Sequence, residues 1–196
     1  MHNFAISKPQ KIAIVLSLKN LKIHLAKKTI LKNKSQIKRS AKFINLDEAH
    51  SVLVLFELKD EQTFKEVERF AESLRLRGKQ VKLWCYYPQN KLPLFFTPTG
   101  NQQCLTRKQL KWFPIPNEKA IAGFNEIQPD ILIDLSQSDC YPMKYLATIS
   151  GATLKVGENS DFNQFIFDLL IQKDDHLPLT NFIQNVTHYL THINKT

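Results

Sequence analysis

Hydroxyl and carboxylate side chains follow the clearest apolar run in the second half of the chain. Asp134 lies within this run, residues 130–135, and Ser136, Ser138 and Asp139 come directly after it. Such groups beyond the end of a buried strand could hold a small polar ligand, and Asp134 could be a carboxylate with a shifted pKa. Ser and Asp after a strand more often form a turn and cap the next helix, and Asp134 would then bond adjacent loop backbone while partly exposed. Both interpretations stay open.

The cysteines and histidines do not form a recognisable site. Cys85, Cys104 and Cys140 are odd in number, widely spaced and without a CxxC pair, which predicts neither a disulfide framework nor a zinc site. Cys140 has no neighbouring histidine to activate it as a nucleophile. His188 and His192 have the i, i+4 spacing of a metal pair, but as the surface of a helix they need no metal. Free thiols fit a reducing cytoplasm.

Glycine-rich phosphate motifs are missing as well. The chain has five glycines, and none lies between the first predicted strand and the helix after it, so neither GxGxxG nor a P-loop is present. This disfavours a dinucleotide or a nucleoside triphosphate in the usual place. We therefore predict no catalytic residue, no metal and no cofactor.

Positive charge is concentrated at the amino-terminal end. Residues 1–46 contain eleven basic side chains and no acid, whereas the other 150 residues contain sixteen basic and eighteen acidic side chains. An unbroken cationic segment next to a near-neutral body is typical of contact with an anionic partner. The predicted nucleic-acid contacts are the basic residues of its second half: Lys27, Lys28, Lys32, Lys34, Lys38, Arg39 and Lys42.

The same segment has helical periodicity. Ile14, Leu18, Leu21 and Leu25 fall on one face of a helix, which predicts a basic amphipathic helix from about residue 11 toward 42, with a weak point at 33–35. Its apolar runs are too short to span a bilayer, and no cleavage site follows that would mark a signal peptide. We expect a helical arm over 1–45 and one domain over 46–196. Alternatively, the stripe packs on the sheet and leaves the lysines solvated.

Alternating strands and helices fill the body. Apolar runs predict strands at 51–56, 80–87, 130–135, 153–156 and 165–171. Helical periodicity predicts helices between 61 and 78, at 142–150 and at 180–193, whereas the proline-rich segment 88–116 gives only a short helix after Thr106. This order predicts an α/β fold, a three-layer and mostly parallel Rossmann-like sheet.

Several segments resemble a bacterial family known only as a domain of unknown function. They are SVLVLF (51–56), FAESLR (70–75) before Gly78, KWF (111–113), DILIDL (130–135), and KYL (144–146) with GA (151–152) and KVG (155–157). This resemblance implies a lysine-rich amino-terminal helix before an α/β domain. A local segment, ISGATLKVG (149–157), is similar to the amino-terminal half of heptosyltransferases, whose sugar-nucleotide domain has no room in 196 residues.

These observations lead to a first functional hypothesis and two alternatives. We expect a non-enzymatic cytoplasmic protein whose basic arm docks on structured RNA such as ribosomal RNA. One alternative is a peripheral membrane protein held to anionic lipid by its amphipathic helix. The other is a glycosyltransferase-like, sugar-phosphate enzyme that uses the loop 136–139. The sequence does not identify a protein partner.

Overall fold

A six-stranded parallel sheet forms the centre of the protein. The computed structural model describes residues 8–34, 36, 39–137, 139–174 and 177–193, with side chains from Leu16 onward. The strands lie in the order β3-β2-β1-β4-β5-β6, and every pairing is parallel. Their bounds are β1 Ser51–Glu57, β2 Gln80–Tyr87, β3 Gln102–Thr106, β4 Ile131–Asp134, β5 Leu154–Glu158 and β6 Leu169–Ile171. The predicted fold class is confirmed.

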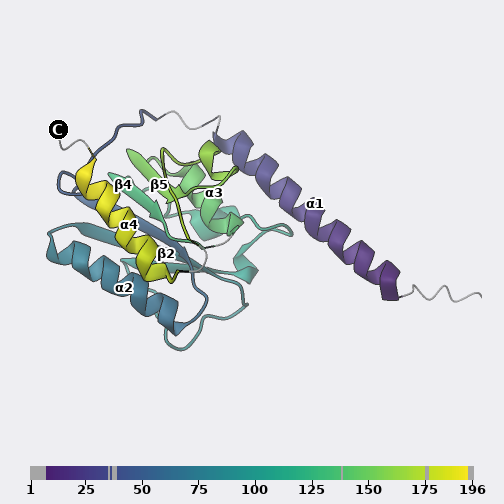
Figure 1. Ribbon diagram of the computed structural model, residues 1–196. Coiled ribbons are helices and arrows are strands. Elements are labelled where there is room, and N and C mark those ends of the chain that lie inside the picture. The colour runs from purple at the N-terminus through teal and green to yellow at the C-terminus, as the bar shows by residue number, and fades with distance from the viewer. Residues whose placement is uncertain (1–7, 35, 37–38, 138, 175–176, 194–196) are drawn as a thin grey trace, which may run out of the picture.

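Helices cover both faces of the sheet (Figure 1). On one face, α2 (Glu61–Leu76) and α4 (Leu179–His192) pack over a first apolar core. On the other, α3 (Tyr141–Ile149), the 3-10 helix η2 (Glu118–Ile121) and the end of α1 (Lys8–Lys34) pack over a second core. Because both faces are covered, the central residues of β1 are all buried, as the continuous apolar run 52–56 requires.

Local signals explain where α2 begins and ends. The Thr63 amide donates a hydrogen bond to the Asp60 side chain at 2.7 Å, which caps the first turn. Gly78 has a φ of +78° just beyond the last turn, a left-handed conformation that glycine adopts without strain. The predicted β1, α2 and β2 therefore agree with the structure to within a few residues.

Two predicted elements need correction. The sequence analysis missed β3, which lies in the proline-rich segment 88–116. It begins with two glutamines and has no apolar run of its own, and its strand conformation depends on pairing with β2. The strand predicted at 165–171 is too long: Asn163–Phe165 is a 3-10 turn, and only Leu169–Ile171 is β6. Ile166 and Phe167 both turn into the second core instead of alternating between faces, which breaks the strand geometry.

The helix α1 ends at Lys34, at the predicted weak point, and does not continue to residue 42. It packs against α3 through Ala26 and Ile30, which are fully buried, with Ile23 half-buried beside them.

The predicted leucine stripe lies elsewhere on the helix. Leu18 and Leu21 are 49% and 47% exposed, and Leu25 is half-buried; the side chain of Ile14 is outside the described residues. At about 100° per residue the two stripes are about 140° apart around α1. The leucine stripe therefore does not pack on the sheet. The domain boundary at residue 45 stays a prediction, although Ala26 and Ile30 belong to the core of the body.

Candidate functional site

The helix α1 extends beyond the edge of the sheet at which the parallel strands end. The ammonium of Lys27 lies 5.1 Å from the centroid of the Phe162 ring, which follows the carboxyl end of β5. Asn33 shares a cavity wall with Gly151, which follows α3 at the opposite, amino edge. From Lys27 back to Lys8 the helix is about 28 Å long, and its amino-terminal part projects away from the sheet (Figure 1).

The described part of α1 is a cationic rod. Between Leu16 and Lys34 it contains six lysines and His24, and no acidic residue. The exposed cations occur all round the helix, and Lys28 and Lys32 fall in the same sector as Leu21 and Leu25. The leucine stripe is thus continued by lysines, and the exposed surface of α1 is mixed apolar and basic.

The residues predicted to contact nucleic acid differ in how exposed their side chains are. Lys28, Lys32, Lys34 and Lys42 are exposed, and Lys27 is half-buried over Phe162; Lys38 lies outside the described residues.

Arg39 has partners within the protein. Its Nη2 donates to both carboxylate oxygens of Asp168 at 2.5 and 2.6 Å, and its Nη1 donates to the carbonyls of Ala152 (2.9 Å) and Thr153 (3.2 Å). These bonds tie the segment after α1 to the body. Phosphate contact by Arg39 stays a prediction, and it would have to compete with this arrangement.

A second group of polar residues lies where the strand order reverses, between β1 and β4. Ligands of doubly wound sheets bind at this place. Asp134, at the end of β4, is buried, and its carboxylate accepts a 2.9 Å bond from the Ser136 amide. Burial raises the pKa of Asp134, while that bond and the charge of Lys144 oppose the rise. The predicted bond to loop backbone is thus present, but Asp134 is buried and not partly exposed.

The loop after β4 does not cap α3 with Ser or Asp. The N-cap residue is Cys140, and it makes no side-chain cap bond. The Ser136 hydroxyl is buried and has no hydrogen-bond partner among the described residues. Burial and the charge of Glu57 raise the pKa of Cys140 well above its ordinary value, so this thiol stays protonated. Ser138 lies outside the described residues.

Lys144 is the member of this group that the sequence analysis missed. It is buried in the first turns of α3, donates to Asn163 Oδ1 at 2.5 Å and lies 3.3 Å from Asp139 Oδ1. The Tyr141 hydroxyl donates to the other oxygen of Asp139 at 3.3 Å. Burial, together with the charge of Asp139, raises the pKa of Tyr141 to about 12. The exposed carboxylate of Asp139 therefore balances the charge of the buried Lys144 ammonium. A lysine among apolar neighbours in a short helix was the available signal.

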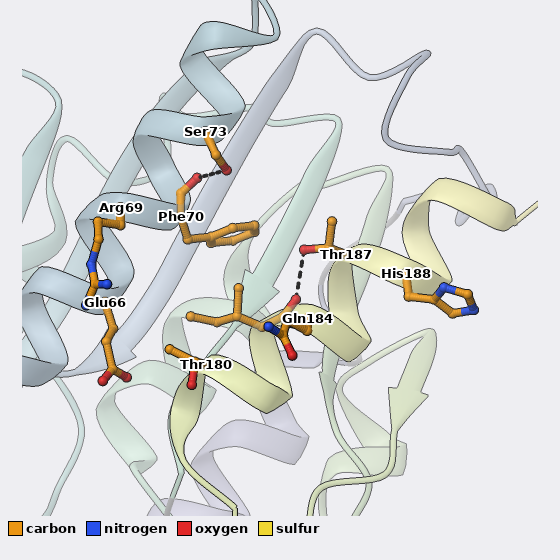
Figure 2. A pocket seen from close by; sticks show the side chains of 9 residues that line it. Glu66, Arg69, Phe70, Ser73, Thr180, Gln184, Thr187 and His188 are labelled. Carbon is orange, nitrogen blue, oxygen red and sulfur yellow. Dashed lines mark hydrogen bonds between the residues drawn. The ribbon is translucent and has the colours of Figure 1, made fainter.

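A groove of about 500 Å³ lies between α2 and α4, on the face of the sheet opposite to α3 (Figure 2). Phe70 and Ile183 supply its apolar wall. The hydroxyls of Ser73 and Thr187 donate to carbonyls of their own helices, at 2.7 and 2.8 Å, so they are engaged. The polar rim consists of Glu66, Arg69, Thr180, Gln184 and His188. The groove offers apolar contact, with no buried ionisable group among its lining residues.

The part of the chain that the structure describes contains neither a metal-binding cluster nor a membrane-spanning helix. There, no group of three or more His, Cys, Asp or Glu side chains could hold a metal ion. His188 and His192 lie on the surface of α4 with ring centroids 4.4 Å apart, and His192 Nδ1 is 2.7 Å from the His188 carbonyl oxygen. No helix of the described ranges is long and apolar enough to cross a membrane.

Fold and edge geometry together define a doubly wound parallel α/β protein with a projecting basic helix. The chain belongs to the family of unknown function DUF6913, which it matches over residues 22–193. The resemblance drawn from the sequence is thereby confirmed. The match begins inside α1 and so includes Ala26, Ile30 and Arg39. No curated protein matches the chain, and the similarity to heptosyltransferases stays a prediction.

Proposed function

We propose that this protein is a cytoplasmic, non-enzymatic RNA-docking protein, in which α1 binds the phosphate backbone of structured RNA and the α/β body serves as its platform. One observation carries the proposal: α1 extends past the sheet, its described segment from Leu16 to Lys34 contains no acid, and Lys19, Lys28, Lys32 and Lys34 are exposed along it. Ribosomal RNA is the structured RNA we would test first.

The way in which α1 is held favours this function. Ala26 and Ile30 fix its carboxyl-terminal end on α3, so the lysines are presented from a rigid support. Lys28 and Lys32 are one turn apart on the side away from this contact. Cations on a phosphate backbone release condensed counterions, which gives affinity without base specificity.

The membrane alternative rests on a different observation, the exposure of Leu16, Leu18 and Leu21. A helix that lies on lipid needs an apolar face separated from its charges. In α1 the charges continue into the leucine sector at Lys28 and Lys32, which favours RNA over lipid.

The sugar-phosphate alternative concerns the loop 136–139. The described contacts of Asp139 are with Lys144 and Tyr141 of the protein itself. Nothing in these contacts favours turnover over a structural role.

Two variants of the full chain separate RNA from lipid. Lys19→Gln/Lys28→Gln/Lys32→Gln removes three exposed cations, and Leu18→Ser/Leu21→Ser removes the two exposed leucines of the leucine stripe. We expect the lysine variant to lose binding to a ribosomal RNA fragment and the leucine variant to keep it. The reverse order, together with binding to vesicles of anionic phospholipid, would support the membrane alternative. Lys82→Gln/Lys91→Gln/Lys119→Gln is the matched control, because it removes three exposed charges from the body.

A further inference from the structure

A small polar cavity lies at the amino edge of the sheet, far along α1 from its projecting end. Its volume is about 220 Å³. Four segments meet there: the end of α1 with the chain after it, the end of α3, the start of β5 and the residues before β6. The polar lining residues are Lys34, Arg39, Thr148, Lys155 and Asp168.

Lys155 is the unusual residue of this cavity. It is 2% exposed, and its Nζ donates to the Thr148 carbonyl at 3.1 Å. The two other N–H donors of the ammonium have no partner among the described residues. A buried ammonium with one neutral acceptor is costly, so lysines are rarely buried without an anion beside them.

Among the described residues of the cavity wall, Asp168 is the one carboxylate, and it does not fill that role. Asp168 accepts two bonds from Arg39, at 2.5 and 2.6 Å, and one from the backbone amide of Lys155, at 2.8 Å. Its charge is therefore matched by the guanidinium of Arg39. Lys34 and Lys155 leave the cavity with an excess of positive charge when both are protonated.

We infer that this cavity binds a small free oxyanion, a phosphate, sulfate or carboxylate group, with Lys155 and Lys34 as its cationic donors. The volume admits such a group and a short carbon skeleton. The site is separate from the RNA surface of α1, and the inference stands without the proposed function. Phosphate of an RNA chain has the same chemistry, so the test includes an arm for each source.

Binding should be coupled to a proton. The charged groups that face Lys155 are Arg39, Lys34 and Asp168. Burial, then the charges of Arg39 and Lys34, lower the pKa of Lys155 to about 7, while Asp168 opposes the shift. An anion placed between these cations favours the protonated amine, so it should bind more tightly below pH 7 than above it.

The probe is sulfate, whose charge is constant over this pH range. Calorimetric titration of the full chain at pH 6 and pH 8.5, in chloride buffers of equal ionic strength, should show roughly tenfold or greater weakening at the higher pH. Lys155→Met, which removes a buried charge and keeps an apolar stem, should weaken sulfate binding at pH 6 by tenfold or more. Lys82→Met, the same change at an exposed strand position, should leave it unaltered.

Two further measurements separate the outcomes. If Lys155→Met does not fold, Lys34→Gln, at the exposed end of α1, should still lower sulfate affinity several-fold. Lys19→Gln/Lys28→Gln/Lys32→Gln should keep sulfate binding, and Lys155→Met should keep RNA binding. Sulfate affinity that is equal in the wild type, Lys155→Met and Lys34→Gln, or that does not change with pH, would overturn the inference. So would failure of the wild type to bind sulfate at pH 6.

Discussion

Replacing Ile30 by alanine tests whether α1 is part of the folded core. Ile30 is fully buried against α3, and the change removes three carbon atoms. At about 0.8 kcal/mol per buried methylene the transfer term alone is about 2.4 kcal/mol. The cavity left behind increases the destabilisation, whereas the better helix propensity of alanine reduces it by about 0.4 kcal/mol. We expect a loss of about 2 to 4 kcal/mol in the free energy of unfolding.

Urea unfolding followed by circular dichroism measures this loss as a lower midpoint at an unchanged slope. Leu21→Ala is the matched control, because Leu21 is on the same helix and 47% exposed; it should change stability by no more than about 0.5 kcal/mol. Equal effects of the two variants, or a larger effect at Leu21, would refute the assignment of the buried stripe to Ile23, Ala26 and Ile30.

Three other variants probe the body. A chain beginning at Asn45 should still unfold cooperatively but less stably than the full chain, since it lacks Ala26 and Ile30; a noncooperative urea transition would place α1 inside the folding unit. Because the folded pKa of Lys155 is about 7 and its unfolded value about 10.4, wild-type stability relative to Lys155→Met should rise as pH increases from 7 toward 10, and a flat difference would contradict the shift. Ser136→Ala should change the unfolding free energy by no more than about 1 kcal/mol, because the Ser136 hydroxyl has no partner among the described residues. Adding Asp139→Asn should lower stability further, because it leaves the buried Lys144 ammonium with the neutral acceptor Asn163; loss of a sugar-nucleotide turnover present in the wild type would instead support the enzyme alternative.

Local sequence signals were sufficient for the elements that carry their own periodicity. In β1 this signal is the continuous apolar run, and in α2 it is the helical spacing of Val67, Phe70 and Leu74. Asp60, as the N-cap residue, also marks where α2 begins. β3 has no such signal. Its residues Gln102 and Gln103 are polar, and only pairing with β2 makes the segment a strand.

The docking face of α1 could not be chosen from the sequence, because the helix has two apolar stripes. The leucine stripe has more large side chains, but α3 receives Ala26, whose small side chain allows close approach of the two helices, together with Ile30. That complementarity involves residues more than a hundred positions apart.

The buried lysines were missed for a related reason. A lysine in a sequence normally predicts a solvent-exposed position. The hydrogen-bond acceptors of Lys144 and Lys155 lie in other elements of the fold. For Lys155 a signal was present, since it lies between Leu154 and Val156 in a strand buried on both faces. The acceptors around it could not be identified without the fold.

The salt dependence of RNA binding tests the central claim most directly. If α1 makes five or six phosphate contacts, the logarithm of the association constant should fall with the logarithm of salt concentration with a slope of about −4 to −5. Lys19→Gln/Lys28→Gln/Lys32→Gln should reduce the magnitude of that slope by about 2 to 3 and weaken all RNA sequences alike, whereas the body control Lys82→Gln/Lys91→Gln/Lys119→Gln should leave it unchanged. An unchanged slope in the helix variant, or binding that does not depend on salt between about 50 and 200 mM, would contradict docking through α1.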